Sequence, residues 1–113
     1  IQAVPNANGL VALDVSNPAR AAEVARVELE NDDWPHWIAL APSQRRIVVT
    51  GYAGTRHRVV MIDLDPASGQ MSVDQAFTTA SGGKPGVTFD RAEWPHGATG
   101  PGDPHGAVFS RLN

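Results

Sequence analysis

The sequence predicts an all-β protein, and three observations support this prediction. Glycine and proline are frequent, with 11 and 9 copies among 113 residues, so turns interrupt the chain too often for long helices. The segments between these turns are rich in β-branched residues, which favour strands. Four such segments follow one another within residues 36–77, which is the length of one four-stranded blade of a β-propeller.

The first two predicted strands are residues 10–15 and 22–29. The first ends at Ser16-Asn17-Pro18, because turn formers are followed by a residue that cannot donate to a strand ladder. A helix over residues 18–29 is the alternative to the second strand, since the alanines there have high helical propensity. We expect residues 10–29 to be the end of one blade.

Two hairpins are predicted next, and together they make a complete blade over residues 36–77. The first hairpin turns at the polar tip 43–46 and the second at residues 65–69. In the second turn Pro66 presets φ, and Gly69 can adopt the left-handed conformation that the exit requires. The predicted strands are residues 35–42, 47–52, 59–64 and 70–77. Leu13-Asp14-Val15 before Pro18 resembles Ile62-Asp63-Leu64 before Pro66, which indicates a repeat.

Residues 47–49 and 59–62 are continuous apolar runs, as expected for strands covered on both faces. A blade has such cover because it lies between two others. We therefore expect the chain to be one part of a larger propeller and to be unstable as a free monomer. Its partners would be the remaining blades of the same propeller or other copies of the chain.

The rest of the chain is predicted to be a long loop and a strand. Residues 78–104 are rich in glycine and proline and have little regular patterning, so we expect a loop there. Within it, residues 81–84 resemble a phosphate-binding loop but lack the required spacing. Residues 105–110 are predicted to be a strand of a further blade.

Charge and composition exclude several classes of function. The net charge is −3 and the nine basic residues are scattered, so nucleic acid is not an expected partner. No apolar run approaches the roughly 20 residues that a membrane span needs. The chain begins at Ile1, which suggests a processed piece, and cytoplasmic, periplasmic and secreted locations all stay open. Without cysteine, any metal must be bound by histidines and carboxylates.

Three of the four histidines directly follow a proline, and these are the candidate metal ligands: His36, His96 and His105. Proline stiffens the backbone and would aim each imidazole reproducibly. Neutral imidazoles are the natural ligands of copper or zinc when thiolates are missing. The alternative is that these histidines hydrogen-bond to loops at the rim of the propeller.

Other side chains are weaker candidates. His57 lies between two arginines in a hairpin loop, and we expect it to be solvated. Three carboxylates near the histidines are candidates to orient an imidazole or to cap turns: Asp90, Glu93 and Asp103. Three tryptophans are candidates for the walls of a pocket or for packing: Trp34, Trp37 and Trp94.

Several segments resemble the C-terminal blades of the selenium-binding protein and methanethiol oxidase family, and more loosely YVTN-type and lactonase-like propellers. The matching segments are residues 13–18, the hairpin at 41–50, residues 62–65 leading to 68–71, and the histidine near the C-terminus. The resemblance implies that His105 faces the central channel and helps to hold a metal, thought to be copper in that family. It predicts a metal-dependent oxidoreductase. The alternatives are a non-catalytic binding scaffold and a lactonase-like hydrolase.

Overall fold

The computed structural model describes residues 1–55, 57–79 and 83–110. In these residues the secondary structure is β-strand with two single-turn 3₁₀ helices, η1 (Pro5–Ala7) and η2 (Pro18–Arg20), and no α-helix. The strands are β1 (Gln2–Val4), β2 (Gly9–Asp14), β3 (Ala22–Glu28), β4 (Pro35–Leu40), β5 (Arg46–Gly51), β6 (Arg58–Leu64), β7 (Met71–Val73) and β8 (Val87–Thr88). The prediction of an all-β fold is confirmed.

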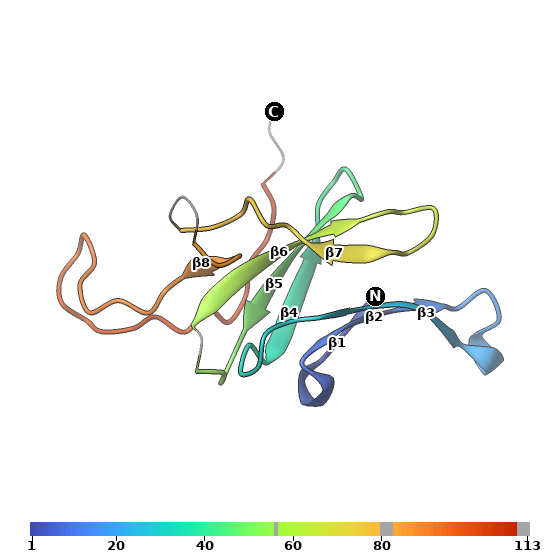
Figure 1. Cartoon of the computed structure of the whole chain (residues 1–113), viewed down its shortest axis with the longest axis horizontal. Helices are drawn as coiled ribbons and strands as arrows, with labels where there is room; N and C mark the ends of the chain where they lie inside the picture. The colour runs from blue at the N-terminus through green and yellow to red at the C-terminus, as the bar shows by residue number, and fades with distance from the viewer. Residues whose placement is uncertain (56, 80–82, 111–113) are drawn as a thin grey trace.

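The strands form two antiparallel sheets that lie one over the other (Figure 1). The first has the order β1-β2-β3, and the second has the order β4-β5-β6-β7 with β8 beside β6. In the second sheet β4 to β7 pair consecutively, as predicted for residues 36–77. Neither sheet closes on itself, so the described residues establish two stacked sheets and leave the propeller as a proposal.

The first sheet settles the choice between strand and helix for residues 18–29. Only Pro18–Arg20 is helical, as one 3₁₀ turn that starts where the Asn17 side chain accepts a hydrogen bond from Ala19 N at 3.1 Å. Ala22–Glu28 then pairs with β2, where six of its seven residues have ladder partners and Ala25 enters the core. Strand β1, which we did not predict, completes this sheet.

The turn between β6 and β7 has the chemistry that its sequence predicts. The Asp65 carboxylate accepts hydrogen bonds from Ser68 Oγ at 2.5 Å and from Ala67 N at 3.0 Å. These bonds, with that of Ser68 the larger contribution, lower the pKa of Asp65. Gly69 has a φ of +76°, which only glycine adopts without strain.

The core lies between the two sheets. Leu10 of β2 packs against Ile47, Val49, Val60 and Ile62 of β5 and β6, and all five are at most 2% exposed. Since side chains alternate along a strand, these residues share the face of the second sheet that meets the first.

The opposite face of the second sheet is also covered within the chain. Val48 and Met61 point to that side and are each only 7% exposed. The C-terminal segment crosses this face, where Thr50 Oγ1 donates to the His105 carbonyl at 2.8 Å. The expectation that these apolar runs need further blades for cover is therefore wrong. The prediction of an unstable monomer was based on that expectation and loses its support.

A buried ion pair joins the link between the sheets to β6. Asp33 is 3% exposed and accepts two hydrogen bonds of 2.6 Å from Arg58, one from Nε and one from Nη2. Arg58 Nη1 donates to the carbonyl of Pro85 at 2.6 Å, which fixes the loop before β8. The hydrogen bonds to Asp33 raise the pKa of Arg58 above its ordinary value.

One prediction about the last third of the chain is wrong, and another is incomplete. The predicted loop 78–104 contains β8, which pairs with β6 where β7 has ended, because Val59 has an open edge there that Val87 can use. Residues 105–110 are not a strand. The carbonyls of His105 and Ala107 accept hydrogen bonds from side chains of the second sheet instead of from the backbone of a neighbouring strand. Of the predicted phosphate-like segment 81–84, residues 81 and 82 lie outside the described residues.

Candidate functional site

The start of β4 presents His36 from a β-bulge. Pro35 pairs with Gly51 and Trp37 pairs with Thr50, so His36 is the extra residue between two ladder positions. Bulges re-aim side chains and are common near functional sites. Pro35 is fully buried while His36 is exposed, so a fixed backbone carries an accessible imidazole.

His105 reaches the same place from the other end of the chain. Its carbonyl accepts the hydrogen bond from Thr50, and the carbonyl of Ala107 accepts one from Trp37 Nε1 at 3.0 Å. Gly106 passes under the Trp37 ring, which a Cβ at this glycine would approach to 3.7 Å. The segment is thus held at two successive points beside β4 and β5.

The two imidazoles are in direct contact. His36 Nε2 and His105 Nε2 lie 3.2 Å apart, whereas the ring centroids are 5.1 Å apart, so the Nε2 ends converge. The Tyr52 ring packs against both, with its centroid 4.3 Å from that of His105 and 5.4 Å from that of His36. All three side chains are exposed to solvent.

This spacing suits two states of the pair. Without a metal, one imidazole N–H can donate to the unprotonated nitrogen of the other. With a metal, two nitrogens bonded at about 2.05 Å to one tetrahedral ion lie about 3.3 Å apart, close to the observed 3.2 Å. Within residues 1–55, 57–79 and 83–110, no three histidine or carboxylate side chains are grouped as metal ligands. The pair therefore fits one edge of a coordination sphere.

Thr50 is expected to position His105. We expect Thr50→Val to release residues 104–110, because valine has the same shape but cannot donate to the His105 carbonyl. Chymotrypsin should then cleave after Phe109 several-fold faster than in the unchanged chain. Thr50→Ser keeps the hydroxyl and is the matched control, so equal cleavage rates in the two variants would contradict this role.

His96 lies elsewhere. Its ring stacks on Trp94, with the centroids 6.3 Å apart, in a loop that projects from the sheets (Figure 1). This loop is organised around Trp94, whose Nε1 donates to Gly100 O at 2.8 Å and whose ring lies 4.3 Å from the guanidinium carbon of Arg91. The structure therefore brings together two of the three predicted ligands, His36 and His105.

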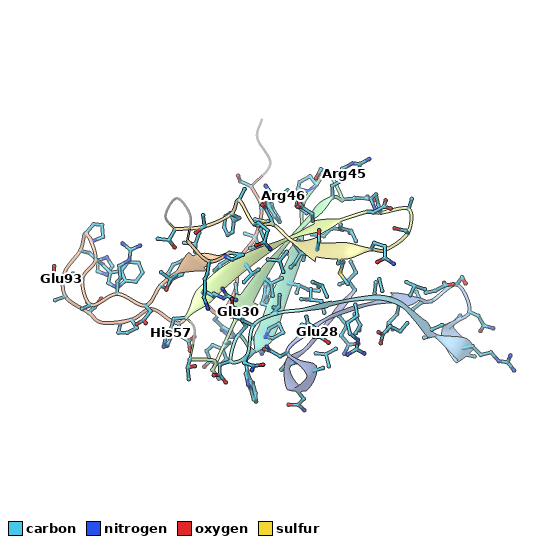
Figure 2. All side chains as sticks on the ribbon, in the orientation of Figure 1. Glu28, Glu30, Arg45, Arg46, His57 and Glu93 are labelled. Atoms are coloured by element: carbon cyan, nitrogen blue, oxygen red, sulfur yellow. The ribbon has the colours of Figure 1, made fainter. Side chains whose placement is uncertain are left out.

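The expectation that His57 is solvated is wrong. Its side chain is 29% exposed and lies near the start of β6 (Figure 2). Its Nδ1 atom is buried without a hydrogen-bond partner among the described residues and lies 3.9 Å from Asp103 Oδ1. Burial follows from the backbone, since Phe89 N donates to the His57 carbonyl at 2.6 Å and places the C-terminal loop over it.

The remaining candidates have other surroundings. Of the carboxylates, Asp103 faces His57, Asp90 lies just after β8, and Glu93 lies at the tip of the projecting loop (Figure 2). Trp37 and Trp94 each donate a hydrogen bond from Nε1 to a loop carbonyl, whereas the side chains of Trp37 and Trp34 are 47% and 45% exposed. The sequence analysis missed Tyr52, which directly follows Gly51, the ladder partner of Pro35.

Comparison with known proteins gives no further guide to this site. No protein-family model, curated protein or solved structure matches the chain. In the described residues no helix has the length and apolar character that a membrane span requires. The function must therefore be inferred from the geometry of the side chains.

Proposed function

We propose that the chain binds a transition metal through His36 and His105, and that its two sheets are neighbouring blades of a β-propeller. The observation that supports the metal site is the 3.2 Å separation of the two exposed Nε2 atoms. Two neutral nitrogens at this distance on a fixed backbone need little rearrangement to bind one ion.

The way the sheets stack supports the propeller part of the proposal. β1 lies against β4 and β3 lies against β7, so the strands of the two stacked sheets follow one another in the same direction across the sheets. Neighbouring blades stack in this manner, with their innermost strands on one side and their outermost strands on the other. In this arrangement β4 is the innermost strand of its blade, and His36 lies at the end of that strand.

The two β-hairpin turns add support for a repeat. Asp14, the last residue of β2, accepts a hydrogen bond from Ser16 N at 2.8 Å, and Asp65, directly after β6, accepts one from Ala67 N at 3.0 Å. In each case the carboxylate binds the amide two residues further along. The amide of Ser16 lowers the pKa of Asp14, and the Ser68 hydroxyl, followed by the Ala67 amide, lowers the pKa of Asp65. Equivalent turns at equivalent places in two stacked sheets are expected of repeated blades.

Copper and zinc are the metals that this donor set favours. Imidazole nitrogen is a good ligand for both, and the chain has no cysteine to select between them. Bound copper would supply redox chemistry and bound zinc Lewis-acid chemistry. The chain itself contributes the two nitrogens, a tyrosine ring that orients them, and a segment that is held by Thr50 and Trp37.

The test is the metal affinity of single-histidine variants. We expect His105→Ala and His36→Ala each to weaken Zn²⁺ or Cu²⁺ binding at least tenfold in calorimetric titration, because each removes half of the ligand pair. His96→Ala is the matched control, since His96 is also exposed and follows a proline but lies in the projecting loop. Equal affinities in all three variants would contradict the proposed site.

A binding scaffold is the second candidate function. The projecting loop favours it, because Arg91 and His96 each stack on the Trp94 ring. Internal hydrogen bonds, including the pair between Trp94 and Gly97, make the loop a preformed surface. A chain that binds no metal but keeps this loop ordered would favour the scaffold.

A further inference from the structure

We infer that one metal ion joins two copies of this chain, with each copy contributing His36 and His105 to a shared four-nitrogen site. This inference rests on the proposed metal-binding function and adds the partner. It follows from the number of ligands, from the position of the pair at a sheet edge, and from the exposed rings around it.

The number of ligands comes first. Zinc in a closed site takes four protein ligands, and the described residues group only two imidazoles at this place, with no third histidine or carboxylate. A second copy supplies two more nitrogens of the same kind. In a closed propeller, further blades would supply these two remaining ligands.

The geometry of the pair agrees with a two-fold arrangement. One copy's nitrogens, 3.2 Å apart, match one edge of a coordination tetrahedron. The opposite edge is equal in length and perpendicular to the first, so a two-fold axis through the metal generates it from a second copy. Most homodimers have this symmetry, in which the same surface patch of each chain faces the other.

The position of the pair allows a second copy to approach. His36 lies on β4, which is the edge strand of its sheet, and both imidazoles are exposed. Two large rings beside the pair are also exposed, Tyr52 by 42% and Trp37 by 47%. Tyrosine and tryptophan are enriched at protein interfaces, because they bury much apolar area and keep a polar atom for hydrogen bonding. Burying these rings would favour a second copy over water as the source of the remaining ligands.

The experiment uses the full chain and ZnCl₂ as the probe. The mass is measured by light scattering during gel filtration while Zn²⁺ is added, and the stoichiometry is measured by calorimetry. We expect the mass to rise from 12.0 kDa to twice that value, with saturation at one Zn²⁺ per two chains and reversal by EDTA. His36→Ala and His105→Ala should stay at the monomer mass with Zn²⁺ present, whereas His96→Ala should dimerise.

The outcomes separate this inference from the proposed function. Saturation at one Zn²⁺ per chain without a change in mass would overturn the bridged dimer and leave the metal site standing. Absence of Zn²⁺ binding would overturn the bridged dimer, and absence of Cu²⁺ binding as well would overturn the proposed function. A dimer that is unaffected by EDTA would overturn the bridging role of the metal. If a histidine variant fails to fold, the visible absorption spectrum of Co²⁺ bound to the unchanged chain still tests the four-nitrogen site. Strong visible bands of tetrahedral Co²⁺ at half an equivalent are expected, and the weak bands of a water-rich octahedral ion would contradict the four-nitrogen site.

Discussion

Arg58→Ala is expected to lower the free energy of unfolding by about 3–5 kcal/mol, because it leaves the Asp33 carboxylate buried without its partner. Asp33 is 3% exposed, and both of its oxygens accept 2.6 Å hydrogen bonds from the same guanidinium. The change also removes the donor that Arg58 Nη1 offers to Pro85 O. Arg58 is the shared partner of Asp33 and of the loop before β8, so the change removes a contact from both.

The chain contains a matched control for this effect. Arg26 and Glu23 form an ion pair of the same two-bond type, at 2.9 and 2.8 Å, but their side chains are 44% and 42% exposed. Arg26→Ala should therefore leave the urea midpoint nearly unchanged, because water screens an exposed ion pair. Arg58→Lys should recover only part of the loss, because lysine keeps the charge but cannot form the two parallel hydrogen bonds.

Urea unfolding monitored by tryptophan fluorescence measures these differences. The midpoints and slopes of the transitions give the unfolding free energies of the chain and of each variant. Similar midpoints for Arg58→Ala and Arg26→Ala would show that burial of Asp33 adds nothing, and would contradict the prediction. The two pairs share the two-bond geometry and differ in burial, and Arg58 has in addition the hydrogen bond to Pro85 O.

The parts of the fold that the sequence predicts are those fixed by local chemistry. The turn at Asp65 to Gly69 is closed by the aspartate itself and by a glycine with positive φ, so its position can be recognised from five residues. Alternation and β-branching then define the strands on either side. Such features act over a few residues and need no knowledge of the rest of the chain.

The parts that the sequence does not predict depend on long-range partners. β8 is only Val87–Thr88, and it is a strand because β6 has an open edge beside Val59 after β7 has ended. Residues 105–110 have a strand-like composition, yet Thr50 and Trp37 bind their carbonyls from 55 and 70 positions away. In both cases the decisive partner lies outside any local pattern.

The candidate site divides in the same way. The Pro-His motif identifies His36 and His105, because the proline acts on the residue next to it. It identifies His96 equally well, and only the fold places His96 against Trp94 instead. Tyr52 has no motif of its own, and its ring reaches both imidazoles because the hairpin pairs the preceding Gly51 with Pro35. The burial of Asp33 was equally hidden, since residues 30–33 are acidic and indicate a solvated loop.

Gly51→Ala is expected to lower the free energy of unfolding by about 3 kcal/mol, at the upper end of the cost of overpacking. A Cβ at Gly51 would overlap the carbonyl oxygen of Asp33 and lie 3.0 Å from its carbonyl carbon. These are backbone atoms of a buried residue, so they cannot move aside as the end of a flexible side chain could. Gly51 also pairs with Pro35, so the same shift would reach the β-bulge that presents His36.

The consequence is that one methyl group should weaken two properties together. We expect Gly51→Ala to lower the urea midpoint and to reduce Zn²⁺ affinity several-fold, because the separation of the His36 and His105 nitrogens depends on the backbone beside Gly51. Gly106→Ala is the control, since its Cβ would meet only the Trp37 ring at an ordinary 3.7 Å. That change should be neutral or stabilise by a few tenths of a kcal/mol, because alanine has fewer unfolded conformations than glycine. If Gly51→Ala unfolds at the same urea concentration as Gly106→Ala, the close contact between β5 and the Asp33 carbonyl is not a constraint on this fold.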